Sequence, residues 1–136
     1  MASGPLIAVV DDDVSLREAL SGLLSAYGYR IDAYSSGYDL LASELLGDYD
    51  LFILDVQMPG IDGLELQEGI LAAGVDAPIV FLTSNQDREV RTRALDMGAA
   101  AFLGKPFQSS DLLAQLDGAL SAANRPPVTD SGRTAG

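Results

Sequence analysis

LFILDVQMPG, residues Leu51–Gly60, contains the clearest structural signal in this chain. Its first four residues form an apolar run without a polar break, which predicts a strand buried on both faces of a parallel sheet. The run ends at Asp55, and the turn residues Pro59 and Gly60 follow a few positions later. Open α/β sheets place their chemistry at the carboxyl ends of such strands. We therefore interpret Asp55 as the first candidate functional residue.

Similar apolar runs alternate with helical patterns along the whole chain. We predict strands at residues 6–10, 30–34, 51–54, 79–83 and 100–103. We predict helices between Asp13 and Gly28, between Ser36 and Gly47, and at residues 63–73, 86–97 and 110–122. This alternation predicts an α/β fold, a doubly wound five-stranded parallel sheet with right-handed crossovers. The more polar strand at 30–34 is expected at an edge of the sheet.

Several details of the helices can also be predicted. Ser15 with Glu18 fits a capping box for the first helix, and Asp13 is the alternative cap. The apolar spacing places Tyr27 in the first helix and turns Leu45 of the second helix inward. The fourth helix has the thinnest apolar stripe of the five, so its docking on the sheet should be the least strongly fixed.

Composition excludes several classes of protein. The 136 residues have a formal net charge of −12 and a pI near 4.1, so we expect neither nucleic-acid binding by this domain nor docking on an anionic membrane. The chain has no cysteine and no histidine, which rules out disulfides and histidine-based catalysis. Its N-terminus lacks the basic region of a signal peptide. A cytoplasmic location is the expectation.

Four of the predicted strands end on polar residues. These are Asp11 and Asp12, Asp55, Thr83 and Lys105, the last of which is the only lysine in the chain. The carboxyl ends of parallel strands lie at one edge of a sheet, so these side chains should meet in one crevice. Crowded carboxylates need compensation, which Mg²⁺ supplies, and a lysine and a hydroxyl suit a phosphoryl group. The set predicts metal-assisted phosphoryl transfer onto Asp55.

Each of these residues also has a simpler interpretation. Acidic residues at 11–13 could complement a helix N-terminus, and Asp55 could be a helix cap or a turn residue. Lys105, which precedes a proline, could lie in a solvated loop, and Phe102 could be an ordinary core residue. The arginines at 88, 91 and 93 could form a solvated helix face. The functional interpretation depends on these residues occurring together at the ends of successive predicted strands.

Four blocks in order, VVDDD, ILDVQMPG, FLTS and FLGKPF, resemble the signature blocks of the receiver domain of bacterial two-component response regulators. The resemblance covers about residues 6–122. It implies a flavodoxin-like (βα)5 fold, and the strand order 2-1-3-4-5 is taken from the resemblance and from that fold group. Residues 1–123 would be the receiver domain, and residues 124–136, with Pro126 and Pro127, a flexible tail or a linker to an output domain.

The resemblance also implies roles for individual residues. Asp55 would be the phosphoacceptor, and Thr83 and Lys105 would bind the phosphoryl group. Phe102 matches the aromatic switch position, although it lacks the hydroxyl of the tyrosine often found there. The Lys105–Pro106 bond would be cis.

A metal site and two tuning positions are implied as well. Asp12 and Asp55 would hold Mg²⁺ directly, Asp11 would act through water, and Gln57 would contribute its backbone carbonyl. Mn²⁺ could replace Mg²⁺. Gln57 and Asn85 occupy positions that vary in the family and tune the lifetime of the phosphoryl group.

Three functions compete at this stage. The first is a phospho-accepting switch that is no enzyme apart from catalysing its own phosphorylation and dephosphorylation. The second is an aspartyl-nucleophile phosphatase-type hydrolase, which usually carries its nucleophile on the first strand rather than the third. The third is a non-catalytic interaction module with the same fold.

The switch interpretation predicts partners. A sensor histidine kinase would supply the phosphoryl group, and an output domain or downstream protein, which controls transcription, would receive the signal. The surface formed by the fourth helix and fifth strand would change on phosphorylation and mediate docking or a phosphorylation-dependent homodimer. The receiver would then be of the type joined to a helix-turn-helix output.

Overall fold

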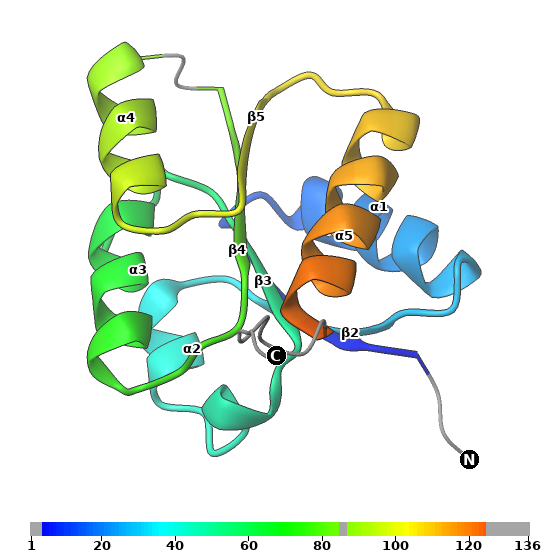
Figure 1. Ribbon diagram of the computed structural model, residues 1–136, viewed down its shortest axis with the longest axis horizontal. Coiled ribbons are helices and arrows are strands. Elements are labelled where there is room, and N and C mark those ends of the chain that lie inside the picture. The colour runs from blue at the N-terminus through cyan, green and yellow to red at the C-terminus, as the bar shows by residue number, and fades with distance from the viewer. Residues whose placement is uncertain (1–3, 85–86, 125–136) are drawn as a thin grey trace, which may run out of the picture.

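The computed structural model describes residues 4–84 and 87–124, which form one five-stranded sheet with helices on both faces (Figure 1). All strand pairs are parallel and the order is β2-β1-β3-β4-β5, as predicted. The strands are β1 (Leu6–Val10), β2 (Arg30–Tyr34), β3 (Leu51–Leu54), β4 (Ile79–Thr83) and β5 (Ala101–Gly104). The helices are α1 (Val14–Ala26), α2 (Gly37–Leu41), α3 (Gly63–Ala72), α4 (Arg88–Asp96) and α5 (Ser109–Asn124), with a 3₁₀ turn, η1 (Leu46–Asp48). The predicted first residue of the fourth helix, Gln86, lies outside the described residues, and Asp87 is the N-cap of α4.

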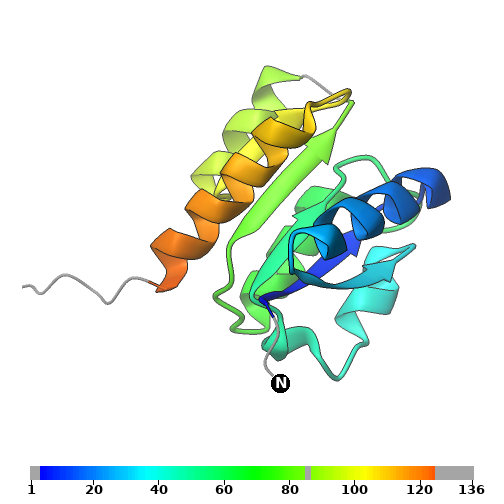
Figure 2. The same ribbon diagram turned by 90° about the vertical axis from the view of Figure 1, so that its right-hand side faces the viewer.

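The helices form two layers, which Figures 1 and 2 show on opposite sides of the sheet. Helices α1 and α5 pack on one face, where Leu24 and Leu116 join the core. Helices α2, α3 and α4 pack on the other face, where Leu66 and Ala94 join a second core cluster. Because β3 is covered on both faces, all four of its residues are buried. This coverage explains why its sequence is apolar without alternation.

The first helix differs from the prediction at both of its ends. The first helix is capped by Asp13, whose Oδ1 accepts hydrogen bonds from the amides of Ser15 (2.9 Å) and Leu16 (3.3 Å), so the Ser15–Glu18 capping box is wrong. Tyr27 follows the last turn of α1 and is 64% exposed, because the chain turns at Gly28 with φ +91°. The helix ends one residue earlier than its apolar spacing indicates.

The second helix is also shorter than predicted. It ends at Leu41, and Leu45 is exposed rather than inward-facing. The Ser43 hydroxyl accepts a hydrogen bond from the Leu45 amide at 3.0 Å, and the chain then forms η1. A serine that bonds to nearby backbone in this way offers the chain an alternative to helix, which explains the early end.

The edge strand β2 is held by a network of partly buried polar groups. The hydroxyl groups of Tyr34 and Tyr49 are hydrogen-bonded to each other, and Tyr49 also donates to Asp32 Oδ2 at 2.8 Å. Burial, followed by these hydrogen bonds, raises the pKa of Tyr49. The network fastens β2 to the segment that precedes β3. Among the residues that the structure describes, no helix combines the length and apolar character needed to cross a membrane.

Candidate functional site

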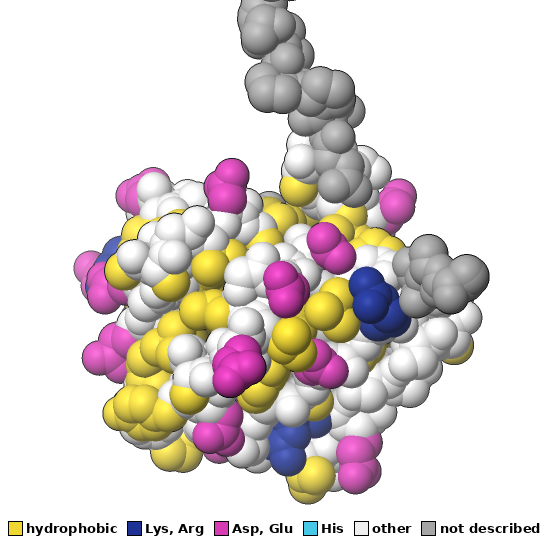
Figure 3. Space-filling view, turned by 90° about the horizontal axis from the view of Figure 1, so that it is seen from below, with side chains coloured by type: hydrophobic (Ala, Val, Ile, Leu, Met, Phe, Trp, Pro, Cys, Tyr) yellow, Lys and Arg dark blue, Asp and Glu magenta, His cyan; other side chains and the backbone are white. Residues whose placement is uncertain are grey.

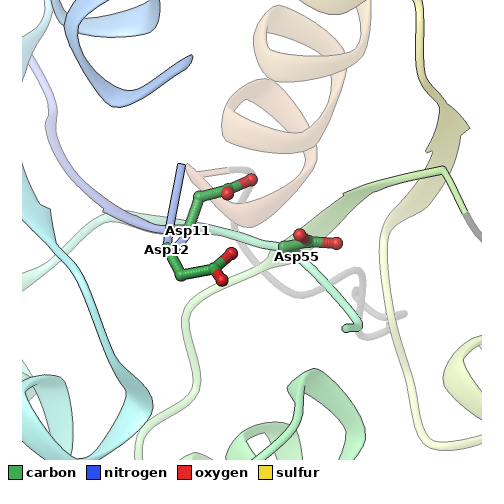
Figure 4. Close-up of side chains that lie close together, drawn as sticks. All are labelled: Asp11, Asp12 and Asp55. Carbon is green, nitrogen blue, oxygen red and sulfur yellow. The ribbon is translucent and has the colours of Figure 1, made fainter. Parts of the chain in front are cut away.

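The ends of the two central strands bring Asp11 and Asp55 together. The Asp55 amide donates to the carbonyl of Val10 at 3.0 Å, in register with the β1–β3 pairing, so each aspartate leaves its strand at the same level. Both are buried, with 3% and 7% of their surface exposed, whereas Asp12 is exposed. One carboxylate oxygen from each of the three lies within 4.8 Å of the others (Figure 4). The predicted convergence of Asp11, Asp12 and Asp55 is confirmed.

Lys105 reaches the same point from β5. Its amide donates to the Thr83 carbonyl at 2.8 Å, which ties the loop after β5 to the end of β4. Its Nζ donates to Asp11 Oδ2 at 2.8 Å and to Asp55 Oδ2 at 3.3 Å. The Lys105–Pro106 bond is cis, as the resemblance implies. Lys105 is therefore a bridging cation and not a solvated loop residue.

Backbone and side-chain donors hold the carboxylates in place. The Asp13 amide donates to Asp11 Oδ1 at 2.9 Å, and the Gln57 amide donates to Asp55 Oδ1 at 3.3 Å. The Arg17 guanidinium donates to the backbone carbonyl of Asp11 at 2.7 Å. No pattern in the sequence indicates this contact, although Arg17 is the lone cation in the first turns of α1, next to an acidic loop.

The electrostatics of the site favour an incoming positive charge. Burial, and then the charge of Asp11, raise the pKa of Asp55, while Lys105 and the Gln57 amide offset part of this rise. Burial alone lowers the pKa of Lys105, but its hydrogen bond to Asp11 and the charges of Asp11 and Asp55 raise it more, to above its usual range. The lysine therefore stays charged, and the carboxylates are only partly compensated.

This imbalance predicts a pH-dependent cost to stability. The folded chain holds the Asp55 proton more tightly than the unfolded chain, so the free energy of unfolding falls as pH rises from the ordinary carboxyl pKa of 3.8 through the raised value. We expect Asp55→Asn to melt a few degrees higher than the natural chain at pH 7 without divalent metal. The difference should vanish below pH 3.8, where Asp55 is protonated in both states. Thermal melts across pH check this, and a lower melting temperature at pH 7 would contradict it.

The donor set fits a hard divalent cation. Three carboxylates supply the oxygen ligands that Mg²⁺ prefers, and their net negative charge exceeds the single positive charge of Lys105. Asp12 is exposed, so the cluster opens to solvent on that side. The backbone carbonyl of Gln57 lies two residues beyond Asp55, and the Gln57 side chain is exposed at the rim.

The two predicted switch residues lie beside the site. Thr83 is fully buried at the carboxyl end of β4, opposite Gly104 of β5. Phe102 is partly buried, and its ring centroid lies 5.9 Å from that of Phe81 on the neighbouring strand. The predicted tuning residue Asn85 lies outside the described residues.

The loop after Asp55 approaches its backbone closely. The Gly63 amide donates to the Val56 carbonyl at 2.8 Å, and a Cβ at position 63 would lie 2.3 Å from the Asp55 carbonyl oxygen. Asp62 caps α3 in a capping box with Glu65. Asp55 is therefore not the cap of that helix, and its carboxylate is left for the site.

The three arginines of α4 do not form one cluster. All are exposed, and none makes a salt bridge within the described part of the chain. Arg93 lines a hollow of about 540 Å³ between α4 and the loop after β3. Arg91 lines a hollow of about 230 Å³ on the other flank, with Leu95, Phe102 and Gln115. Arg91 and Arg93 therefore lie on different faces of α4.

Comparison with known proteins agrees with this geometry. The family model for the response regulator receiver domain matches residues 7–117. The chain belongs to this family. It is 37% identical over 110 residues to the transcriptional regulatory protein DltR of Streptococcus agalactiae. The aligned residues make up 81% of this chain and 49% of that protein. The receiver domain thus spans about half the length of the curated relatives it matches.

Solved structures show the same fold. The response regulator StyR superposes with a TM-score of 0.82 and 36% identity, over 90% of this chain and 61% of that one. The chemotaxis protein CheY4 of Vibrio cholerae superposes with a TM-score of 0.78 and 29% identity, over 85% and 98% of the two chains. The flavodoxin-like fold predicted for this receiver domain is confirmed.

Proposed function

We propose that this receiver domain is a cytoplasmic switch that takes a phosphoryl group from the phosphohistidine of a sensor histidine kinase onto Asp55. The observation that carries the proposal is the bridge from Lys105 Nζ to both Asp11 and Asp55, inside a cluster of three carboxylates. A cation placed between two strand-end carboxylates is poised to neutralise an added anion at Asp55.

The transfer follows from these positions. An Asp55 carboxylate oxygen attacks phosphorus, the N–P bond of the phosphohistidine breaks, and the leaving imidazole keeps the electron pair and takes up a proton. The product is an acyl phosphate on Asp55. Lys105 and the Thr83 hydroxyl would bind the phosphoryl oxygens. Asp12, Asp55 and the Gln57 carbonyl would hold Mg²⁺ or Mn²⁺, with Asp11 acting through water, and the ion would neutralise phosphoryl charge when bound.

One experiment separates the candidate functions. The chain is incubated with acetyl phosphate and Mg²⁺ and its intact mass is measured over time. A phosphoryl adduct on a single site supports the switch. Release of inorganic phosphate with no detectable adduct would instead support the phosphatase-type hydrolase. A chain that neither gains mass nor releases phosphate would be a non-catalytic interaction module.

The metal role of Asp12 is tested by a matched pair of variants. We expect Asp12→Asn to weaken Mg²⁺ binding roughly tenfold, equivalent to about 1.4 kcal/mol, because a ligand carboxylate is lost. Asp13→Asn removes the same charge from the next residue, and asparagine preserves the helix cap. Magnesium titrations followed by amide chemical shifts measure both. Equal weakening in the two variants would show a general charge effect and no ligand role for Asp12.

The output surface is proposed to be the face formed by α4 and β5. Only Ala94 of α4 is buried, so this helix has fewer buried residues than any of the other four helices and the smallest anchor on the sheet. The helix follows Thr83, and Phe102 lies on the adjacent strand. A hydroxyl drawn toward a phosphoryl group would free space that Phe102 fills, which changes the contour beside Arg91.

This face would pass the signal to an output. The part of the relatives that aligns with this chain is about half of their length, and DltR is named a transcriptional regulatory protein, so we propose an output that controls transcription, of the helix-turn-helix type. Residues 1–123 would be the receiver and residues 124–136 its tail or linker. Because the whole chain has a net charge of −12, the receiver is not expected to contact DNA or membranes.

Arg91 is the residue whose loss should affect this face most. Helix α5 carries no cation, so a symmetric pairing through charged residues of α4, β5 and α5 is disfavoured, and an α4–β5 contact is expected. We expect the beryllofluoride mimic to promote self-association or output docking, and Arg91→Glu to abolish it. Arg93→Glu, with the same charge change on the other flank of α4, should respond like the natural chain. Sedimentation checks this, and identical behaviour of the two variants would refute the assigned face.

A further inference from the structure

A hollow at the end of the molecule remote from Asp55 has no part in the proposed phosphoryl transfer. This basal groove has a volume of about 440 Å³ and lies where β4 begins. Its walls come from the end of α3, the turn between α4 and β5, and the last turns of α5, so it joins the two helical layers. Figure 3 views the molecule from below and shows apolar side chains among scattered acidic ones at this end.

The lining of the basal groove is mostly apolar. Leu71, Met97 and Ala119 contribute side chains, and Leu71 is 46% exposed although it is a large apolar residue. Among the described residues that line the groove, Asp76 is the one carboxylate, and it is exposed. A surface of this kind suits a short apolar segment that carries a positive charge at one end.

We propose that residues 125–128, Arg-Pro-Pro-Val, occupy the basal groove. The segment follows α5 directly, and Ala122 and Ala123 of the last turn already line the groove. Four residues reach at most about 14 Å, which keeps the segment near its exit point. Its two prolines and valine match the apolar lining, and Arg125 matches Asp76. The first residues after the helix are then part of the receiver domain, and the free linker begins after them.

Occupation of this groove would connect α4 to the chain that leaves the domain. Gln67 of α3 lines the groove, is 1% exposed, and donates from Nε2 to the Ala94 carbonyl of α4 at 3.1 Å. The same carbonyl accepts the Ala99 amide at 3.0 Å, where α4 ends. A segment seated in the groove would contact the turn at Met97 and Gly98 that follows this anchor. A displacement of this end of α4 would therefore also move the segment 125–128, through which the chain leaves the domain.

Disulfide trapping tests the location directly, because the natural chain has no cysteine. One variant carries Leu71→Cys with Val128→Cys. Its control carries Tyr27→Cys with Val128→Cys, since Tyr27 is exposed and ends α1 at the same end of the sheet, away from the groove. A tethered segment has an effective concentration in the millimolar range wherever it can reach, so the comparison between positions is what matters.

The expected result is intramolecular trapping at least several-fold faster for the 71–128 pair than for the 27–128 pair. Equal rates would mean that the segment does not select the groove. Disulfide-linked dimers in place of intramolecular closure would assign the groove to a second copy of the chain. Either outcome overturns the proposal.

A second measurement uses the chain without cysteines. Pro127→Asp puts a charge into the proposed occupant, and Ser131→Asp adds the same charge farther along the tail. We expect Pro127→Asp to shift the amide resonances of Leu71 and Gly98, and Ser131→Asp to leave them in place. The proposal requires this difference, and it fails if the two variants give the same spectrum at these amides.

Discussion

Asp55→Asn is expected to leave no phosphoryl adduct after incubation with acetyl phosphate and Mg²⁺. Asparagine keeps the shape of the side chain and can still accept the Gln57 amide, but it has no carboxylate oxygen to attack phosphorus. Asp11 is the other buried carboxylate that Lys105 contacts, but it ends β1 rather than β3 and is not predicted to take the phosphoryl group. Intact mass spectrometry measures the adduct.

The matched control is Asp48→Asn. Asp48 lies in the exposed turn η1, so this change removes one carboxylate without altering the site. Full modification of Asp48→Asn beside an unmodified Asp55→Asn would support the assignment. An adduct of unchanged yield on Asp55→Asn would place the phosphoacceptor elsewhere, and peptide mapping would then identify it.

Lys105→Ala is expected to affect both stability and signalling. Removal of one partner from a buried ion pair leaves uncompensated charge, and we expect the free energy of unfolding to fall by about 3 kcal/mol in the absence of divalent metal. This is the lower end of the usual cost, because 21% of the Lys105 side chain is exposed. Addition of Mg²⁺ should restore part of the loss, since the ion binds only the folded cluster.

The signalling effect of Lys105→Ala is read separately. Without Nζ near Asp55, an added phosphoryl group has no cation that links it to β5 and, through the Lys105 amide, to Thr83. We expect beryllofluoride to shift the amide resonances of Phe102 and α4 in the natural chain and much less in the variant. Arg30→Ala is the control, because it removes a cation from the edge strand, away from the site. Equal shifts in Lys105→Ala and the natural chain would reject the coupling role.

The sheet and the convergence of the site were predictable from sequence for a clear physical reason. Strands buried on both faces must be apolar throughout, so the polar residues that end them, such as Asp55, stand out. The parallel arrangement then places those residues at one edge. The geometry of Asp11, Asp55 and Lys105 is confirmed on this basis, whereas their chemical roles stay predictions.

The features that could not be predicted depend on side-chain contacts, which the spacing of apolar residues does not reveal. Leu45 fitted the helical spacing, but the Ser43 hydroxyl ended the helix first. Arg17 supports the Asp11 carbonyl only because a long side chain reaches back across the loop. Gln67 is polar yet 1% exposed, because its partner is a carbonyl on another helix, which no local pattern reveals. Each miss involves one side chain that bonds to backbone.

The close approach of Gly63 to the Asp55 carbonyl divides the loop after β3 into two parts with different evolutionary freedom. Any side chain at position 63 would collide with the backbone of Asp55, so glycine is required where α3 begins beside the end of β3, whatever the rest of the loop contains. Gln57 is exposed at the rim of the same loop and meets no such restriction. Residue 57, for which we predict a role in the lifetime of the phosphoryl group, can therefore vary while the scaffold beneath it stays constant.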